Sequence, residues 1–133
     1  MTEPVLNLDP NHKPYVPTSL SEIYDLLGSM ILDAPTFVDE LGYFPERNID
    51  TMFRMLTDGL VACRKALGEP PYAEMIDLAG RAKALFAADQ DDSNGKTDEG
   101  RALLFQMEDL LQAVRSRRVR DKLPDDEGEI TGD

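Results

Sequence analysis

The sequence lacks several residue types on which large classes of protein function depend. It contains no tryptophan, one cysteine (Cys63) and one histidine (His12) among 133 residues. A single cysteine cannot form an internal disulfide or a structural zinc site, and one histidine excludes a histidine-rich metal site. His12 lies near the N-terminus and Cys63 within an apolar helical pattern, so we expect no Cys-His or Ser-His catalytic relay. Gly-x-Gly-x-x-Gly and P-loop patterns are also absent.

Positive charge and long apolar runs are scarce as well. The chain has 14 Lys and Arg against 26 Asp and Glu, for a formal net charge of -12. We therefore expect no binding to nucleic acid or to a membrane surface, since both need positive charge to meet phosphate. No segment approaches the roughly 18 consecutive apolar residues of a membrane span, and the first residues do not resemble a signal peptide. Together with the single cysteine, this predicts a cytoplasmic protein.

The sequence does contain strong helical periodicity. It is clearest in residues 48–68, where apolar residues recur every three or four positions and form one stripe along a helix. Asn48 or Asp50 can cap the start of this helix, and Gly68 followed by two prolines can end it. The stripe consists of Ile49, Met52, Phe53, Leu56, Leu60, Cys63 and Leu67.

Three further long helices are predicted on similar grounds. The first opens at Ser19, with Glu22 as the second half of a capping box, and ends at residues 33–35. The next runs over residues 71–88, and the last follows Thr97 as its N-cap and continues to about residue 122. A short helical turn is expected at residues 36–41.

These elements predict an all-α fold, a small up-and-down helical bundle of four main helices plus one short connecting helix. The bundle domain would cover residues 18–122, after an extended Pro-rich arm at 1–17 and before an acidic disordered tail at 123–133. Four of the nine aromatic residues lie between Phe37 and Phe53. We expect that segment to close one end of the core, because clustered aromatic residues beside a helix start usually pack.

Two acidic patterns invite comparison with known metal sites. The loop at residues 89–100 has the wrong glycine and glutamate spacing for a calcium-binding EF-hand. Two Glu-x-x-Asp pairs, Glu22 with Asp25 and Glu74 with Asp77, would each lie on one helical face. Their spacing resembles the paired carboxylates of magnesium-dependent all-helical nucleotide pyrophosphohydrolases of the MazG type. That resemblance rests on these four residues and implies an alternative function as such an enzyme.

Basic residues are concentrated at only one place, the end of the last predicted helix. Cations there complement the negative end of the helix dipole, which is the interpretation we favour over a phosphate or nucleic-acid contact. The cluster consists of Arg115, Arg117, Arg118, Arg120 and Lys122.

The favoured functional hypothesis is an acidic helical protein-binding module that neutralises or chaperones a basic protein partner. Immunity proteins of bacterial toxins, secretion chaperones and phage-encoded inhibitors share its size, charge and helicity. We expect no catalytic residue, metal or cofactor, and a homodimer formed through exposed parts of the apolar stripes is compatible with this hypothesis. The predicted partner-binding residues are a run of acids with no base among them: Glu22, Asp25, Asp33, Asp39 and Glu40.

Overall fold

The computed structural model describes residues 15–39 and 41–121. Within these residues the chain forms helices and no strands, which confirms the all-α class. The predicted tail at 123–133, residues 1–14 of the predicted arm, and Glu40 lie outside the described residues. The helices are α1 (Leu20–Asp33), α2 (Ile49–Ala62), α3 (Arg64–Leu67), α4 (Glu69–Ala87) and α5 (Lys96–Arg120).

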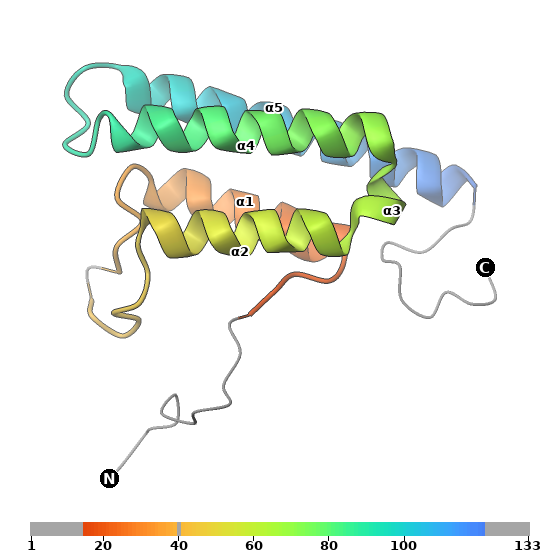
Figure 1. Ribbon diagram of the computed structural model, residues 1–133, viewed down its shortest axis with the longest axis horizontal. Coiled ribbons are helices and arrows are strands. Elements are labelled where there is room, and N and C mark those ends of the chain that lie inside the picture. Colours follow the sequence, from red (N-terminus) through yellow and green to blue (C-terminus); the bar gives the residue numbers. More distant parts are fainter. Residues whose placement is uncertain (1–14, 40, 122–133) are drawn as a thin grey trace, which may run out of the picture.

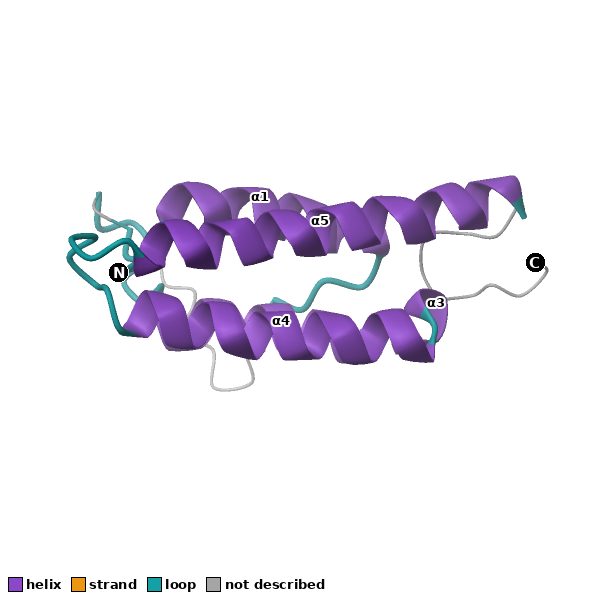
Figure 2. Cartoon of the chain, turned by 90° about the horizontal axis from the view of Figure 1, so that it is seen from above, coloured by secondary structure: helices purple, strands orange, loops and turns teal. Residues whose placement is uncertain are grey.

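The four long helices lie in two layers (Figures 1 and 2). α4 and α5 lie side by side above α2 and α1, and successive long helices run in opposite directions. Each long helix contacts two others: α4 and α5 contact one another, as do α1 and α5, α2 and α4, and α1 and α2. None of the helices in residues 15–39 and 41–121 is both long and apolar enough to cross a membrane.

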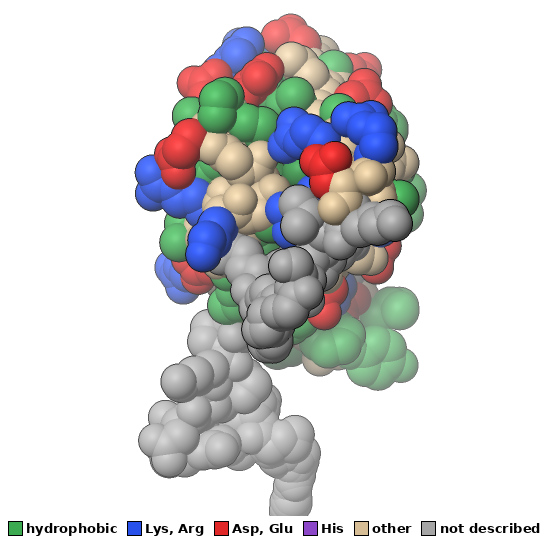
Figure 3. All heavy atoms as spheres, turned by 90° about the vertical axis from the view of Figure 1, so that its right-hand side faces the viewer, with side chains coloured by type: hydrophobic (Ala, Val, Ile, Leu, Met, Phe, Trp, Pro, Cys, Tyr) green, Lys and Arg blue, Asp and Glu red, His purple; other side chains and the backbone are tan. Residues whose placement is uncertain are grey.

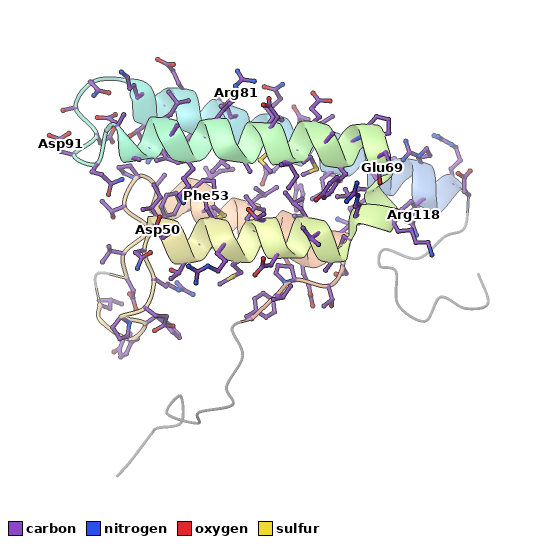
Figure 4. The ribbon with its side chains drawn as sticks, in the orientation of Figure 1. Asp50, Phe53, Glu69, Arg81, Asp91 and Arg118 are labelled. Carbon is purple, nitrogen blue, oxygen red and sulfur yellow. The ribbon has the colours of Figure 1, made fainter. Side chains whose placement is uncertain are left out.

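The core lies between the two layers and is densest around three phenylalanines. Phe37 packs edge-on against Phe53 and Phe86, with ring centroids 5.6 and 5.3 Å apart, and all three are almost fully buried. Figure 4 shows Phe53 pointing from α2 into the space between the layers. Gly100 of α5 lies against the Phe86 ring, so closely that a Cβ there would be 2.6 Å from Phe86 Cε1. The absence of a side chain at Gly100 therefore lets α5 approach α4.

The predicted N-terminal caps of the first two long helices are present. The Ser19 hydroxyl accepts a hydrogen bond from the Glu22 amide at 3.1 Å. The Glu22 carboxylate reaches back to accept from the amide of Thr18 at 2.7 Å, one residue before the N-cap. Asn48 and Thr51 make the full reciprocal box at the start of α2. These caps satisfy amides that have no partner within the helix.

The predicted helix at 48–68 is interrupted at Cys63, which separates α2 from the short helix α3. The apolar stripe continues through the interruption because Leu60, Cys63 and Leu67 are all fully buried. Gly68 has the positive φ of 88° expected of a terminating glycine. The next helix starts at Glu69 rather than at residue 71, so both prolines lie in its first turn, where a missing N–H costs little.

The predicted helical turn at 36–41 is wrong. The described residues there form successive turns, in which Phe37 N donates to Asp33 O and Gly42 N donates to Asp39 O. The short connecting helix of the structure is instead α3. A helix of a single turn is stable only when its side chains pack on neighbouring residues. Ala66 and Leu67 of α3 are buried in this way, whereas Val38 and Leu41 of the predicted turn are exposed.

Thr97 does not cap α5, contrary to the prediction. The helix begins at Lys96, so Thr97 lies within its first turn. The Thr97 amide is satisfied by Asp89, a buried residue eight positions earlier, and the Lys96 amide by the Asn94 side chain. The Asp89 carboxylate accepts from the amides of Ser93, Asn94 and Thr97 at 2.8, 3.1 and 2.9 Å. Burial alone would raise the pKa of Asp89, but these hydrogen bonds outweigh it and hold the pKa below its ordinary value.

The end of the predicted arm belongs to the folded body. Pro17 is buried, and its ring lies over Gly59 of α2, where a Cβ would be 2.9 Å from Pro17 Cγ. A glycine at this point of the helix therefore provides the space into which the chain docks before α1 begins.

Candidate functional site

The outer surface of α1 carries the first three predicted partner-binding residues. Glu22, Asp25 and Asp33 fall within an arc of about 80° on a helix of 3.6 residues per turn, beside the buried side of α1. The 14 residues of this helix include no Lys or Arg. Asp25 is exposed, and Glu22 and Asp33 are half-buried. We call these three residues the acidic face of α1.

Glu22 differs from the other two because it also has a structural role. Its carboxylate accepts a hydrogen bond from the Thr18 amide at 2.7 Å. That bond lowers the pKa of Glu22, partial burial opposes the shift, and a hydrogen bond from the Tyr15 side chain adds to it. Asp25 and Asp33 therefore remain the simpler probes of recognition at this face.

Asp39 is not available to a partner in the same way, because it organises the loop between α1 and α2. Its two carboxylate oxygens accept from the amides of Leu41 and Phe44 at 3.1 and 2.8 Å. Such Asx-type bonds replace the backbone pairing that a loop lacks. Glu40 lies outside the described residues.

The same loop corrects the prediction that the aromatic segment closes the core. Phe37 and Phe53 do so, but Tyr43 is 75% exposed and Phe44 is 47% exposed. Arg47 lies over the outer Phe44 ring, 4.5 Å from its centroid. We call the exposed apolar residues of this segment the apolar loop; they are Val38, Leu41, Tyr43 and Phe44.

The start of the α1–α2 connection, which precedes the apolar loop, contacts the loop that joins α4 to α5. Gln90 Nε2 donates to the carbonyl oxygens of Pro35 and Phe86, both at 2.8 Å, and so ties the two loops together. Asp91 and Asp92, which follow Gln90, are exposed. Figure 4 shows Asp50, at the start of α2, and Asp91 at this same end of the molecule. Exposed carboxylates of both loops therefore lie at the same end of the molecule as the apolar loop.

Arg101 of α5 holds the C-terminal end of α1 in place beneath this surface. Its guanidinium donates to the carbonyl oxygens of Ile31 and Ala34, both at 3.1 Å, and also to Asp98 at 3.3 Å. Ile31 lies in the last turn of α1 and Ala34 is its C-cap, where intrahelical donors are lacking. This contact fixes the end of α1 from which the apolar loop departs.

The structure does not gather the two Glu-x-x-Asp pairs. Asp25, Glu74 and Asp77 are exposed, and Asp77 lies 3.4 Å from Arg81 in an ion pair. Among the residues that the structure describes, no group of three or more His, Cys, Asp or Glu side chains could hold a metal ion. This geometry offers no observation in favour of the pyrophosphohydrolase alternative.

The basic cluster lies at the opposite end of the molecule, where α3 and the last turns of α5 meet (Figure 1). Arg118 Nη1 donates to Ala66 O of α3 at 3.2 Å. Figure 3 views this end, where basic and acidic side chains are interspersed, with hydrophobic side chains of the far end visible behind the body. Lys122 lies outside the described residues.

The described residues thus define an all-α protein with an acidic face along α1 and an apolar loop beyond the C-terminal end of that helix. No protein-family model, curated protein or solved structure matches the chain. The functional argument therefore rests on the geometry of the chain itself.

Proposed function

We propose that this chain is an acidic protein-binding module, built on an up-and-down helical bundle, that binds and neutralises or chaperones a basic protein partner. The observation that carries the proposal is the acidic face of α1, where three carboxylates share one side of a helix without a base. The net charge of -12 extends the same field over the surface. Such a field steers a cationic partner and disfavours anionic ones.

Solubility alone is the competing explanation for the acidic surface. Elsewhere in the described residues four acids form ion pairs with bases, for example Glu69 with Arg64 at 2.8 Å and Asp50 with Lys83 at 3.0 Å. The acidic face of α1 has no base within its own helix to offset its charge. Concentrated charge of one sign favours recognition over a solvated surface of mixed charge.

Affinity capture with the full chain from the native cell extract, first at low and then at high salt, tests this function. We expect a stoichiometric basic protein that is released by salt, since exposed charges are screened beyond about 8 Å at physiological ionic strength. The interaction should then be measured with a charge-reversal variant of the face, Asp25→Lys with Asp33→Lys.

The matched control is Glu74→Lys with Asp109→Lys, which makes the same change in net charge on exposed positions of α4 and α5. The variant of the α1 face should lose roughly threefold to tenfold more affinity than this control, mainly through slower association. Equal losses in the two variants would show that only total charge matters. That result would reject a specific role for the acidic face of α1.

A further inference from the structure

The apolar loop concentrates exposed apolar side chains in one short segment. Four of the nine exposed large hydrophobic side chains among the described residues lie in this loop, within seven consecutive positions. Leu41 and Tyr43 are 79% and 75% exposed. Single exposed apolar residues are ordinary on protein surfaces, whereas contiguous ones mark interaction sites.

Hydrogen bonds and packing fix the conformation of the described residues of the apolar loop. The Asp39 carboxylate fixes the amides of Leu41 and Phe44, and Gly42 has the positive φ of 81° that the turn requires. At its start Phe37 is 1% exposed and locked between Phe53 and Phe86. A surface that is already ordered loses less conformational entropy on binding, so its apolar contacts contribute more to affinity.

The charges around the loop identify the chemistry of its occupant. From Asp33 to Arg54 the chain that carries the loop has five acids against two bases, Arg47 and Arg54. Arg47 stacks on Phe44, Asp50 is paired with Lys83 of α4, and Arg54 is exposed one turn further along α2. The rim is therefore acidic, which favours an occupant that combines apolar side chains with Lys or Arg.

The same charges disfavour two other occupants. A second copy packed about a two-fold axis would bring this acidic rim against itself, and like charges across an interface are repulsive. An anionic membrane surface would be repelled for the same reason.

We propose that the apolar loop is the docking element for an amphipathic basic segment of the partner. This inference rests on the proposed function and divides it into two parts. The acidic face of α1 accelerates encounter, whereas the apolar loop slows dissociation by burying Leu41, Tyr43 and their neighbours.

The test uses the full chain and two labelled synthetic peptides in fluorescence anisotropy. One is an amphipathic helical peptide of Lys and Leu, and the other replaces each Lys by Gln. The loop variant is Val38→Ser with Phe44→Ser, and the control is Val61→Ser with Phe105→Ser. The control removes the same residue types at nearly the same exposure: 52% and 47% in the loop, 54% and 51% on α2 and α5.

We expect the wild type and the control to bind the Lys and Leu peptide equally, and the loop variant to bind it about tenfold or more weakly. A second variant, Leu41→Ser with Tyr43→Ser, changes the two most exposed members and should show the same loss. Circular dichroism melting checks that each variant remains folded. The Gln and Leu peptide should bind the wild type much more weakly than the Lys and Leu peptide.

Three outcomes would overturn this inference. If both loop variants and the control bound the Lys and Leu peptide equally, the apolar loop would be rejected as the docking element. A loss of binding in the charge-reversal variant of α1 would in that case still support the proposed function. Equal affinity for the Gln and Leu peptide would reject both the basic occupant and the proposed function. A wild-type dimer in sedimentation velocity that the loop variants convert to monomer would identify a second copy as the occupant.

Discussion

Two glycines in neighbouring helices should respond in opposite ways to the same substitution. Gly80 in α4 is exposed, and a Cβ there would meet nothing within 4 Å. Gly100 in α5 is buried, and a Cβ there would lie 2.6, 2.8 and 3.0 Å from three atoms of the Phe86 ring. The ring cannot retreat easily, because it is fully buried and packs on Phe37 and Phe53.

The magnitudes follow from two competing effects. Replacing glycine by alanine within a helix stabilises it by about 0.5–1 kcal/mol, and this effect should act at both positions. Overpacking a core costs about 1–3 kcal/mol, and this effect should act only at Gly100. We therefore expect Gly80→Ala to raise the free energy of unfolding slightly. Gly100→Ala should lie about 1–3 kcal/mol below Gly80→Ala.

Urea denaturation followed by circular dichroism measures the difference, provided that the slope of the transition is unchanged between variants. Phe86→Leu supplies the internal check, because it removes the ring atoms that the new methyl group meets. In that background Gly100→Ala should lose most of its cost, and the double-mutant cycle reports the coupling between the two positions. If Gly100→Ala were as stable as Gly80→Ala in the wild-type background, the packing of α5 on α4 described above would be refuted.

Three other substitutions test contacts at the ends of helices. Asp89→Asn should lower the melting temperature at neutral pH. The pKa of Asp89 in the folded protein lies below its unfolded value of about 4. The difference in melting temperature from the wild type should therefore persist above about pH 4 and shrink as the pH falls through the folded pKa. Arg101→Met should lower the free energy of unfolding by about 1–3 kcal/mol in urea, because the carbonyls of Ile31 and Ala34 lose a charged donor, and Arg101→Lys should recover only part of the loss. Asn48→Ala should cost about 1 kcal/mol by the same assay, and a neutral result would mean that the cap at the start of α2 is not formed.

The long helices were predictable because their signals are local. Apolar residues spaced by three and four positions indicate the buried sides of α1 and α2, and Ser19 and Asn48 mark their starts. The interruption at Cys63 was not predictable in this way. Leu60 and Leu67 keep the helical spacing across it, so the pattern of apolar residues does not reveal where α2 ends.

The cap of α5 shows where local rules fail. Thr97 has the residue type and position of an N-cap, and a rule that considers only neighbouring residues selects it. The actual acceptor, Asp89, lies at the end of α4 and reaches the helix start only because the intervening loop folds back. The pattern that could have indicated it is an acid followed by the turn-forming residues Ser93, Asn94 and Gly95.

The apolar loop was missed for a related reason. Aromatic residues near a helix start are usually buried, and that expectation holds for Phe37 and Phe53. Tyr43 and Phe44 follow Gly42 and precede Pro45, in a segment without helical or alternating periodicity. Periodicity assigns a side chain to the inside or outside only within a regular element, so the direction of these two rings depended on the turn that Asp39 makes.

The acids and the apolar loop together give a stronger argument than either gives alone. Acidic residues on a helix surface serve solubility in many proteins, so the acidic face of α1 has an ordinary explanation by itself. Exposed Leu41 and Tyr43 oppose solubility, and a chain selected only to stay dissolved would gain nothing by holding them outward on a loop fixed by Asp39. The acidic face runs along α1 to Asp33, five residues before the apolar loop begins, so a partner that is both basic and apolar accounts for both features with one continuous contact. Variants that separate charge from apolar contact are therefore the sharpest experiments that this surface allows.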